Sequence, residues 1–429
     1  VMTPEEEACE IIRRLGDLSA PGTDEESYKT FRPIPRLKWG SKVAYELILK
    51  GFPVVLEGGA AEIAPTAMQW TPEYLLDFFA NQQVTVFVSK NRFFRYWDMK
   101  RHTGGYEMPP PPELRKMTFR EFYECAQRDI REKSPRHYLQ ESLNLDTHPQ
   151  LVQEVKDWDW SWVLKVNQEC GWGPQSRNSM FVGLKGACSP AHYDQQENIF
   201  CQIRGHKRVV LSPPADWRCY YCFPSDHACD RQAMANPEKP DLEAFPAFRY
   251  ARLLEADLGP GDAFFLPGSW FHQFTNMTDF CTSINFWSEP PPANVQDAMQ
   301  GKLTASSEMA LIRNVESMLS KSFPTASIPE LLGEWANGEP SAASRQVHEM
   351  AMTLLGNFMQ PQRAELFWSD ALAGRYGRDI SEFVNWKEAQ ESKPPLQPVL
   401  QPGPDEKPPP LVAHARQWGA EMSSLLGSC

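Results

Sequence analysis

Residues 178–288 limit the possible fold more than any other part of the chain. Short runs rich in β-branched and aromatic residues are separated by turn signals, and we expect strands at 180–184, 198–203, 207–211, 263–266 and 283–287. Gly259-Pro-Gly-Asp262 reads as a turn between two of them. Several short strands at this spacing predict an antiparallel sandwich or barrel, and we expect a jelly roll.

Helical patterns flank this β-rich segment, so the predicted fold class is α+β, mainly β with flanking helices. Within residues 31–145, short patterns of helical period alternate with patterns of strand period. We expect helices at 44–51, 71–79 and 118–130 and strands at 53–57, 84–88 and 93–97. Thr71 followed by Pro72 is typical of a helix start. Residues 1–30 look polar, and we expect a loosely ordered N-terminal segment.

The C-terminal third returns to helical periodicity. Met309, Ile312, Val315 and Leu319 fall on one helix face, and Ile328, Leu331, Leu332 and Trp335 follow. Such a stripe is buried either on the chain's own barrel or on a second copy, and periodicity does not separate the two. We divide the chain into the segment 1–30, a β-rich domain 31–300, a helical region 301–340 and a helical extension 341–429. The extension includes a Pro-rich linker at 394–410 and an amphipathic stretch at 411–426.

Composition indicates a protein that binds neither nucleic acid nor membrane. The 429 residues are 41% hydrophobic, enough for a large core, and no run of about 18 apolar residues predicts a membrane helix. The net charge is −12 without a strong basic block, whereas proteins that bind phosphate backbones carry a basic face. The acidic N-terminus lacks the apolar core of a signal peptide, and Val1 suggests a truncated or processed start. We expect the cytoplasm as location, with the nucleus as a second one.

The ten cysteines are irregularly spaced, which favours reduced thiols. One cluster, Cys219, Cys222, His227 and Cys229, allows two interpretations. It is either a structural zinc site or a cysteine-rich loop. The order and spacing of these residues fit no standard zinc motif well, which favours the loop.

The candidate metal ligands are His192, Asp194 and His272. His and Asp two residues apart in a strand point to the same face, and a barrel can bring His272 to them from another strand. Two imidazoles and one carboxylate on one face of a metal leave three positions open, as in non-haem Fe(II) oxygenases. His-x-Asp alone is a weak signal that also arises as a polar pair at a strand edge. Zinc sites use the same residue types, so the pattern alone does not select iron.

Two residues near this motif strengthen the prediction of a metal site. Lys207 falls in the next strand pattern, where a buried cation would pair with the far end of a dicarboxylate co-substrate. The alternative for Lys207 is an exposed basic triplet with His206 and Arg208. Asn198 shares the inward strand period with Asp194, and its alternative is an ordinary turn or strand residue.

The sequence around these residues resembles the JmjC-type Fe(II)- and 2-oxoglutarate-dependent oxygenases, most closely the asparaginyl hydroxylase factor inhibiting HIF. The similar segments extend over about residues 30–337 and comprise 32–36, 138–140, 171–173, 189–198, 202–208, 229–232, 259–262, 285–287 and 312–319. The resemblance implies a double-stranded β-helix of the cupin type. It implies Fe(II) as the metal, 2-oxoglutarate as co-substrate and O2 as oxidant.

The resemblance also implies residue roles. His192, Asp194 and His272 would be both the catalytic residues and the metal ligands. Lys207, Tyr138, Ser189, Asn198 and Asn285 would contact the co-substrate, with Ser189 standing where the family has Thr. Arg231 and Gln232 would orient the amide of a substrate asparagine, which is hydroxylated at its β-carbon. Without the resemblance, a solvated loop is the simpler interpretation of Arg231 and Gln232.

The partners implied are a protein that presents an extended asparagine-containing segment, such as a HIF-type transactivation segment or ankyrin repeats, and a second copy of the chain. Helices within residues 309–336 correspond to the family's dimerisation helices. Departures concern the residues around His272, the extra cysteines at 219–229 and Glu197, which stands where the family has Gln. They bear on substrate preference. Three rival functions stay open: a JmjC histone lysine demethylase or another JmjC hydroxylase, a zinc-dependent cupin enzyme, and a non-catalytic cupin-like scaffold.

Overall fold

The fold is seen in a computed structural model, which describes residues 2–101, 103, 110–143, 149–155, 157–291 and 303–375. The predicted Pro-rich linker 394–410 and the amphipathic stretch 411–426 lie outside these residues.

Eight strands, β7 to β14, build the barrel that the sequence predicts. They are divided between two facing sheets, with β7, β9, β12 and β14 in one and β8, β10, β11 and β13 in the other. Their bounds are β7 Gln175–Gly183, β8 Cys188–Tyr193, β9 Glu197–Arg204, β10 Lys207–Ser212, β11 Leu253–Leu258, β12 Ala263–Leu266, β13 Phe271–Asn276 and β14 Cys281–Ser288. This arrangement is a double-stranded β-helix, the jelly roll of the cupin kind.

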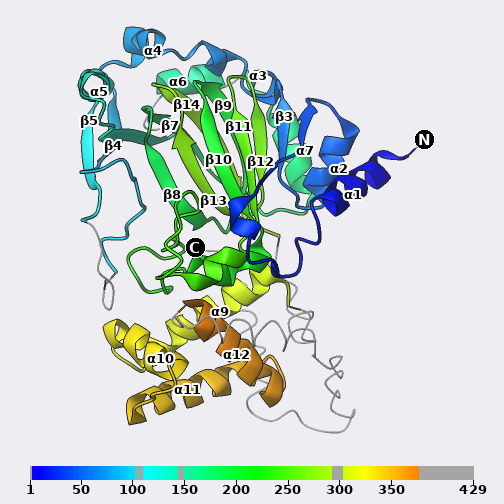
Figure 1. The fold of residues 1–429 in the computed structure, drawn as a ribbon. Coiled ribbons are helices and arrows are strands. Elements are labelled where there is room, and N and C mark those ends of the chain that lie inside the picture. The colour runs from blue at the N-terminus through cyan, green and yellow to red at the C-terminus, as the bar shows by residue number, and fades with distance from the viewer. Residues whose placement is uncertain are drawn as a thin grey trace, which may run out of the picture.

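Strands from the N-terminal part extend both sheets (Figure 1). One sheet reads β2-β3-β12-β9-β14-β7-β6-β4-β5, and the other reads β1-β11-β10-β13-β8. The added strands are β1 Phe31–Pro33, β2 Arg36–Lys38, β3 Val54–Glu57, β4 Gln83–Val88, β5 Glu113–Thr118 and β6 His137–Ser142. The expected strand at 93–97 is wrong. Only Phe93 forms an isolated bridge, to Cys188, because the Asn91 side chain accepts from the Phe93 amide and turns the chain.

Local signals place the helices of the N-terminal part. The Thr71 hydroxyl caps α4 by accepting from the Tyr74 amide, and Thr118 and Glu121 form a reciprocal capping box on α5. The helices are α2 Lys42–Leu49, α3 Gly59–Ile63, α4 Pro72–Phe79, α5 Phe119–Glu132, α6 Pro149–Val155 and α7 Trp160–Glu169. Short 3-10 turns occupy Ser27–Lys29, Thr66–Gln69, Pro214–Tyr220, Pro246–Tyr250 and Thr325–Ser327.

The N-terminal segment is more regular than its polar composition predicts. Residues Pro4–Arg14 form α1, and Ala8 is buried against the rest of the chain. A capping box of Thr3 and Glu6, followed by acidic residues in the first turn and basic ones in the last, stabilises this helix. The expectation of loose order over 1–30 is therefore wrong for this stretch.

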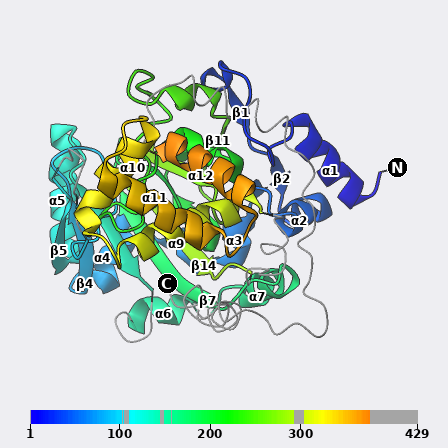
Figure 2. The same cartoon turned by 90° about the horizontal axis from the view of Figure 1, so that it is seen from below.

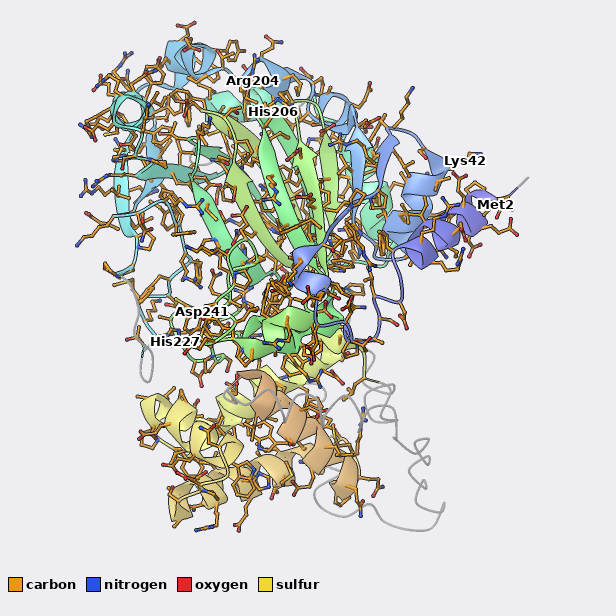
Figure 3. All side chains as sticks on the ribbon, viewed as in Figure 1. Met2, Lys42, Arg204, His206, His227 and Asp241 are labelled. Atoms are coloured by element: carbon orange, nitrogen blue, oxygen red, sulfur yellow. The ribbon has the colours of Figure 1, made fainter. Side chains whose placement is uncertain are left out.

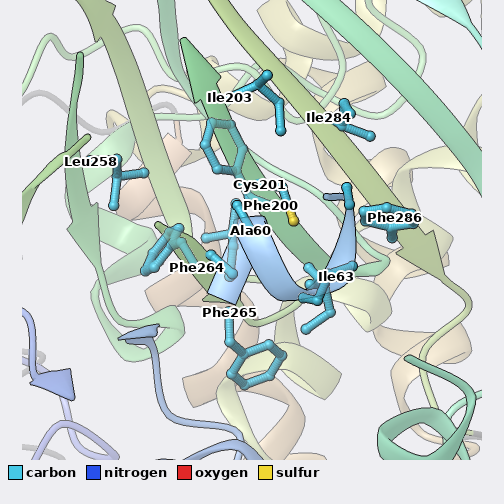
Figure 4. Close-up of a cluster of buried hydrophobic side chains, with 14 of the residues drawn as sticks. Ala60, Ile63, Phe200, Cys201, Ile203, Leu258, Phe264, Phe265, Ile284 and Phe286 are labelled. Carbon is cyan, nitrogen blue, oxygen red and sulfur yellow. The ribbon is translucent and has the colours of Figure 1, made fainter. Parts of the chain in front are cut away.

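One apolar core joins the barrel to the helices of the N-terminal part. Figure 4 shows Ala60 and Ile63 of α3 among aromatic side chains of β9 and β12, such as Phe200 and Phe264. The helix approaches closely because Gly59 has no side chain, and a Cβ there would lie 2.8 Å from Cβ of Ala263. Close packing of this kind fixes the strands that carry the site.

Four further helices cover one end of the barrel, as Figure 1 and the view from below in Figure 2 show. They are α9 Ala305–Leu319, α10 Ile328–Ala336, α11 Ala342–Leu355 and α12 Pro361–Arg375. We call them the helical layer. Of the described helices, none is long and apolar enough to cross a membrane.

The apolar stripe predicted for residues 309–336 is buried within the chain itself. Ile312 is 1% exposed and Leu332 1% exposed, in a second core that the helical layer shares with the loop around 217–253. The stripe is therefore covered without a second copy. A homodimer through 309–336 stays a prediction.

Candidate active site

His192, Asp194 and His272 converge at the end of the barrel nearest the helical layer. His192 lies on β8, Asp194 follows its last residue, and His272 on β13 is the antiparallel partner of His192. One ligand atom from each residue lies within 4.8 Å of the others. The Asp194 oxygens are 4.0 Å from Nε2 of His192 and 3.9 Å from Nε2 of His272. The spacing in the sequence thus predicts the convergence correctly, although Asp194 lies just beyond the strand.

Both imidazoles are held in the tautomer that a metal requires. Nδ1 of His192 lies 2.8 Å from the Pro190 carbonyl, and Nδ1 of His272 lies 2.9 Å from the Trp270 carbonyl. A carbonyl only accepts, so each Nδ1 carries the proton and each Nε2 presents a lone pair. Burial lowers the pKa of both histidines, which keeps the rings neutral and able to coordinate.

Asp194 is oriented from both its side chain and its backbone. The Trp287 indole donates to Oδ2 over 3.2 Å, and the Ser269 amide donates to the Asp194 carbonyl over 2.7 Å. Burial by itself would raise the pKa of Asp194, but the two histidines and Arg231 hold it below its usual value. A charged carboxylate and two neutral imidazoles are a suitable donor set for a divalent transition metal.

Lys207 is buried deep in the barrel, as the co-substrate interpretation requires. Its side chain is 2% exposed, and Nζ donates to the Ser283 hydroxyl over 2.8 Å. The rings of Tyr138, Phe181 and Phe200 lie around it, with centroids 5.4 to 6.0 Å from Nζ. In the described part of the chain no carboxylate lies within ion-pair distance of Lys207. Burial lowers its pKa to about 8. The exposed triplet considered for Lys207 is excluded.

Unused polar groups and a closely packed glycine adjoin Lys207. Asn276 is its partner on β13, and the Asn276 amide nitrogen is buried without a hydrogen bond. A Cβ on Gly183 would lie 2.2 Å from that nitrogen and 2.5 Å from the Tyr138 ring. Tyr138 itself is in hydrogen-bond contact with Ser189. A buried cation with polar groups and no anion of its own fits the distal carboxylate of a dicarboxylate.

Asn198 and Asn285 form a buried amide pair. Nδ2 of Asn198 donates to Oδ1 of Asn285 over 2.8 Å, and Oδ1 of Asn198 has no partner among the described groups. The reasoning that placed Asn198 on the same strand as Asp194 is wrong, because the chain bends after Asp194 and Asn198 lies on β9. Its side chain is nevertheless buried, at 3% exposed, against Asn285 of the neighbouring strand β14.

Arg231 and Gln232 lie beside the metal-binding triad. Gln232 forms an isolated backbone bridge with His192 and its side chain is 3% exposed. Arg231 adopts a left-handed backbone with φ of 65°, and its carbonyl accepts from the Tyr193 amide. The two are therefore part of the wall next to His192, and the alternative of a solvated loop is excluded for them.

A cavity of about 840 Å³ opens onto this triad. His192 and Asp194 reach its wall, and Tyr138, Ser189, Arg231 and Gln232 line it as well. Polar side chains from distant parts of the chain complete the lining, including Gln140, Gln195, Gln196 and Trp287. The cavity is large enough to admit part of a substrate beside the co-substrate.

The cysteine-rich loop does not form a second metal site. Among the described residues, the triad is the one group of His, Cys, Asp and Glu side chains that meets closely enough for a metal. Nδ1 of His227 instead accepts from the Cys229 amide over 3.0 Å. Figure 3 places His227 between the barrel and the helical layer, where the loop is packed as part of the second core.

Several residues of the site were not predicted from sequence. Ser283 and Trp287 flank the predicted Asn285 at alternate positions of β14, so strand periodicity could have found them. Asn276 carries a comparable signal four residues after His272 on β13. For Asp230 and Arg313 the sequence carries no such signal, because the contact between them joins residues 83 positions apart.

The family assignment follows from this fold and site: the chain belongs to the cupin-like domain family, whose sequence profile matches residues 41–294. It is similar to human tRNA wybutosine-synthesizing protein 5, with 27% identity over 60% of this chain and 79% of that protein. It is also similar to lysine-specific demethylase 8 of Xenopus tropicalis, with 25% identity over 65% of this chain and 57% of that protein. Jumonji C domain-containing protein 5 of Drosophila melanogaster is 31% identical over 25% of this chain and 27% of its own.

These relatives define a cupin-like protein related to JmjC-domain proteins. The closer likeness to factor inhibiting HIF, which the sequence motifs indicate, stays a prediction.

Proposed function

We propose that this protein is an Fe(II)- and 2-oxoglutarate-dependent oxygenase. The observation that carries the proposal is the combination of the converging triad with the buried Lys207, which has no carboxylate of its own in the described structure. A scaffold that only binds partners needs neither the fixed histidine tautomers nor this desolvated cation. Three relatives that carry or resemble the JmjC class add independent support.

His192, Asp194 and His272 would hold the metal, and Lys207 with Ser283 would receive the far carboxylate of 2-oxoglutarate. When bound, Fe(II) with 2-oxoglutarate and O2 supplies an oxidative decarboxylation that yields succinate and CO2 and places one oxygen atom in a substrate C–H bond. The chain's own contribution is geometric. Trp287 and the carbonyls of Pro190 and Trp270 fix the ligands, while the aromatic rings around Lys207 exclude water.

Iron is favoured over zinc by the number of coordination positions that the three protein ligands leave open. Two histidines and one carboxylate on one face leave room for a bidentate co-substrate and for oxygen, which is the arrangement of non-haem iron oxygenases. A zinc enzyme with the same triad would need only one open position, and the carboxylate site around Lys207 would then have no role.

Within this class we propose the β-carbon of an asparagine in a polypeptide as the position of hydroxylation. Support comes from Gln232, a buried amide beside His192, and from Arg231, whose Nε has no hydrogen bond. Together they offer donors and an acceptor to a side-chain amide. Lysine demethylation is the second candidate because one relative is named as a demethylase. The arginines of the cavity disfavour it, because they would repel a methylated ammonium.

The oxygenase proposal is tested by succinate formation from 2-oxoglutarate, with metal analysis of protein purified without oxygen. We expect iron-dependent turnover that His192→Ala and Asp194→Ala reduce at least about a hundredfold. His206→Ala is the matched control, because His206 lies on the exposed turn at the opposite end of the barrel (Figure 3). Unchanged turnover in the triad variants would refute the assignment. Zinc-dependent activity would favour the zinc enzyme, and failure to bind either metal would favour a non-catalytic scaffold.

The substrate proposal is tested with an asparagine-containing ankyrin-repeat peptide and a trimethyl-lysine peptide. Mass spectrometry distinguishes a gain of one oxygen atom from the loss of a methyl group. We expect the oxygen on the asparagine of the first peptide. Loss of methyl from the second peptide would select demethylation.

A further inference from the structure

Asp230, on the cavity wall, is surrounded by three arginines. Arg313 of α9 donates to both oxygens, with Nε 3.0 Å from Oδ1 and Nη2 2.5 Å from Oδ2, and Arg101 donates to Oδ2 over 3.1 Å. The side chain of Asp230 is 6% exposed, so these contacts are made out of water. Arg231 lies farther away, with Nε 3.6 Å from Oδ2. The Asp230 carboxylate therefore forms hydrogen bonds with Arg313 and Arg101, and it compensates the charge of Arg231 only weakly.

Arg231 keeps its charge available to the cavity as a result. Its Nε is buried without a hydrogen bond, and its side chain is 26% exposed. The backbone is held by the contact with Tyr193 and by the bridge from Gln232 to His192, so the guanidinium is kept on the wall next to the triad. Its positive charge contributes to lowering the pKa of both His192 and Asp194.

Arg95 is a second cation on this wall. Nη1 donates to the Ala233 carbonyl over 2.8 Å, and the guanidinium lies 5.6 Å from the Phe223 ring centre. In the described part of the chain no carboxylate lies within ion-pair distance of it. Burial lowers the pKa of Arg95, which reports the cost of keeping this cation out of water. Since Arg95 also acts electrostatically on His192, both cations lie near the reacting position.

The remaining charges of the cavity do not balance these two. Five arginines and four carboxylates line the cavity, which leaves an excess of one positive charge before a metal binds. Of the carboxylates, Asp230 contacts Arg101 and Arg313, and Asp194 belongs to the metal triad. Glu141 accepts from the Thr85 amide and lies 3.9 Å from Nζ of Lys116. A local positive excess thus exists inside a chain whose net charge is −12.

We propose that Arg95, with the charge of Arg231 beside it on the cavity wall, forms a subsite for an anionic side chain of a polypeptide substrate, a carboxylate or a phosphate group. This side chain would neighbour the asparagine whose amide Arg231 and Gln232 contact under the proposed function. The inference rests on the proposed oxygenase function and specifies its substrate class. Guanidinium groups bind both anions through paired N–H donors. A polypeptide is favoured over nucleic acid because the cations lie inside a cavity of an acidic protein and do not form a basic surface stripe.

The test measures peptide binding to the full chain loaded with Mn(II) and 2-oxoglutarate under anaerobic conditions, which prevents turnover. Four asparagine-centred peptides differ only in flanking residues: Asp and Glu, phosphoserine, Ser and Gln, or Lys and Arg. We expect the acidic or the phosphorylated peptide to bind about tenfold more tightly than the neutral one by calorimetry. The better of the two identifies the anion. Equal affinities for all four peptides, or no binding by any of them, would overturn the subsite.

Variants then locate the effect. Arg95→Gln should bring the anionic peptide to the affinity of the neutral one, and Arg95→Lys should restore part of the difference. Arg92→Gln is the matched control, because Arg92 lies three residues earlier and does not line the cavity. An equal loss in Arg92→Gln would contradict the assignment. So would a weaker affinity of Arg95→Gln for 2-oxoglutarate, since it would make Arg95 a co-substrate residue.

A short single-stranded RNA serves as a further probe, and binding of RNA in place of the peptides would also overturn the proposal. Failure of the oxygenase function is recognised separately, because the unaltered protein would then form no succinate with Fe(II) and 2-oxoglutarate, whatever the peptides do.

Discussion

The Trp287 indole donates a hydrogen bond to the Asp194 carboxylate over 3.2 Å, which couples β14 to the candidate metal ligands on β8 and β13. Partners of this kind orient a ligand without touching the metal. Trp287→Phe keeps the aromatic packing and removes the donor. We expect metal affinity to fall about tenfold to a hundredfold, measured by competition with a chelator. Trp160→Phe, which loses a hydrogen bond to the Val155 carbonyl outside the site, should leave the affinity unchanged.

Lys207 should determine co-substrate affinity and not the chemical step. Lys207→Met preserves much of the side-chain volume but removes the charge that, under the proposed function, would receive the distal carboxylate of 2-oxoglutarate. We expect the KM for 2-oxoglutarate to rise about tenfold to a hundredfold, because a buried charge-assisted hydrogen bond is lost. The exposed Lys185, changed to Met, is the control. A lower kcat with an unchanged KM would argue against this role.

Co-substrate affinity should depend on pH in the alkaline range. Burial lowers the pKa of Lys207 to about 8, so the free protein loses this charge as pH rises through 8. We expect the dissociation constant of 2-oxoglutarate to be nearly constant from pH 6.5 to 7.5 and to increase above pH 8. Lys207→Arg, which stays charged throughout, should abolish the increase. A flat profile in the unaltered protein would show that Lys207 is not the group responsible.

Glu197 should make the protein less stable as pH rises. Burial raises the pKa of Glu197 to about 7, above the 4.5 of an unperturbed side chain. The folded state therefore holds this proton more tightly than the unfolded state, and stability is lost as pH rises from 4.5 to 7. Glu197→Gln keeps an acceptor for the Gly268 amide and should be more stable than the original protein by about 1–3 kcal/mol at pH 8. At pH 4.5 the thermal unfolding midpoints of the two should coincide.

Sequence patterns located the parts of the site that depend on rare residue types at short spacing. His192 and Asp194 two residues apart, and Lys207 within a strand pattern, could be predicted because strand geometry is periodic. The barrel followed from short strands between turn signals. Asn198 was assigned to the wrong strand because the bend after Asp194 leaves no clear local signal.

Other features depend on contacts that no local pattern encodes. The strand predicted at 93–97 contains suitable residues, but the turn at Asn91 and the single bridge to Cys188 decide its structure. The contact of Asp230 with Arg313 joins the loop before β11 to a helix far along the chain, and only the folded structure brings the two together. The N-terminal helix carries a capping box that can be recognised in the sequence, but the burial of Ala8 against the rest of the chain cannot.

The contact between Arg313 and Asp230 connects the helical layer to the cavity wall. Arg313→Gln would leave the barrel strands, the triad and Lys207 in place but remove a guanidinium that contacts both oxygens of Asp230. Those oxygens would then attract Arg231, whose Nε lies 3.6 Å from Oδ2, and draw it away from the cavity. Under the proposed function, such a variant would still consume 2-oxoglutarate but would select its substrate less well.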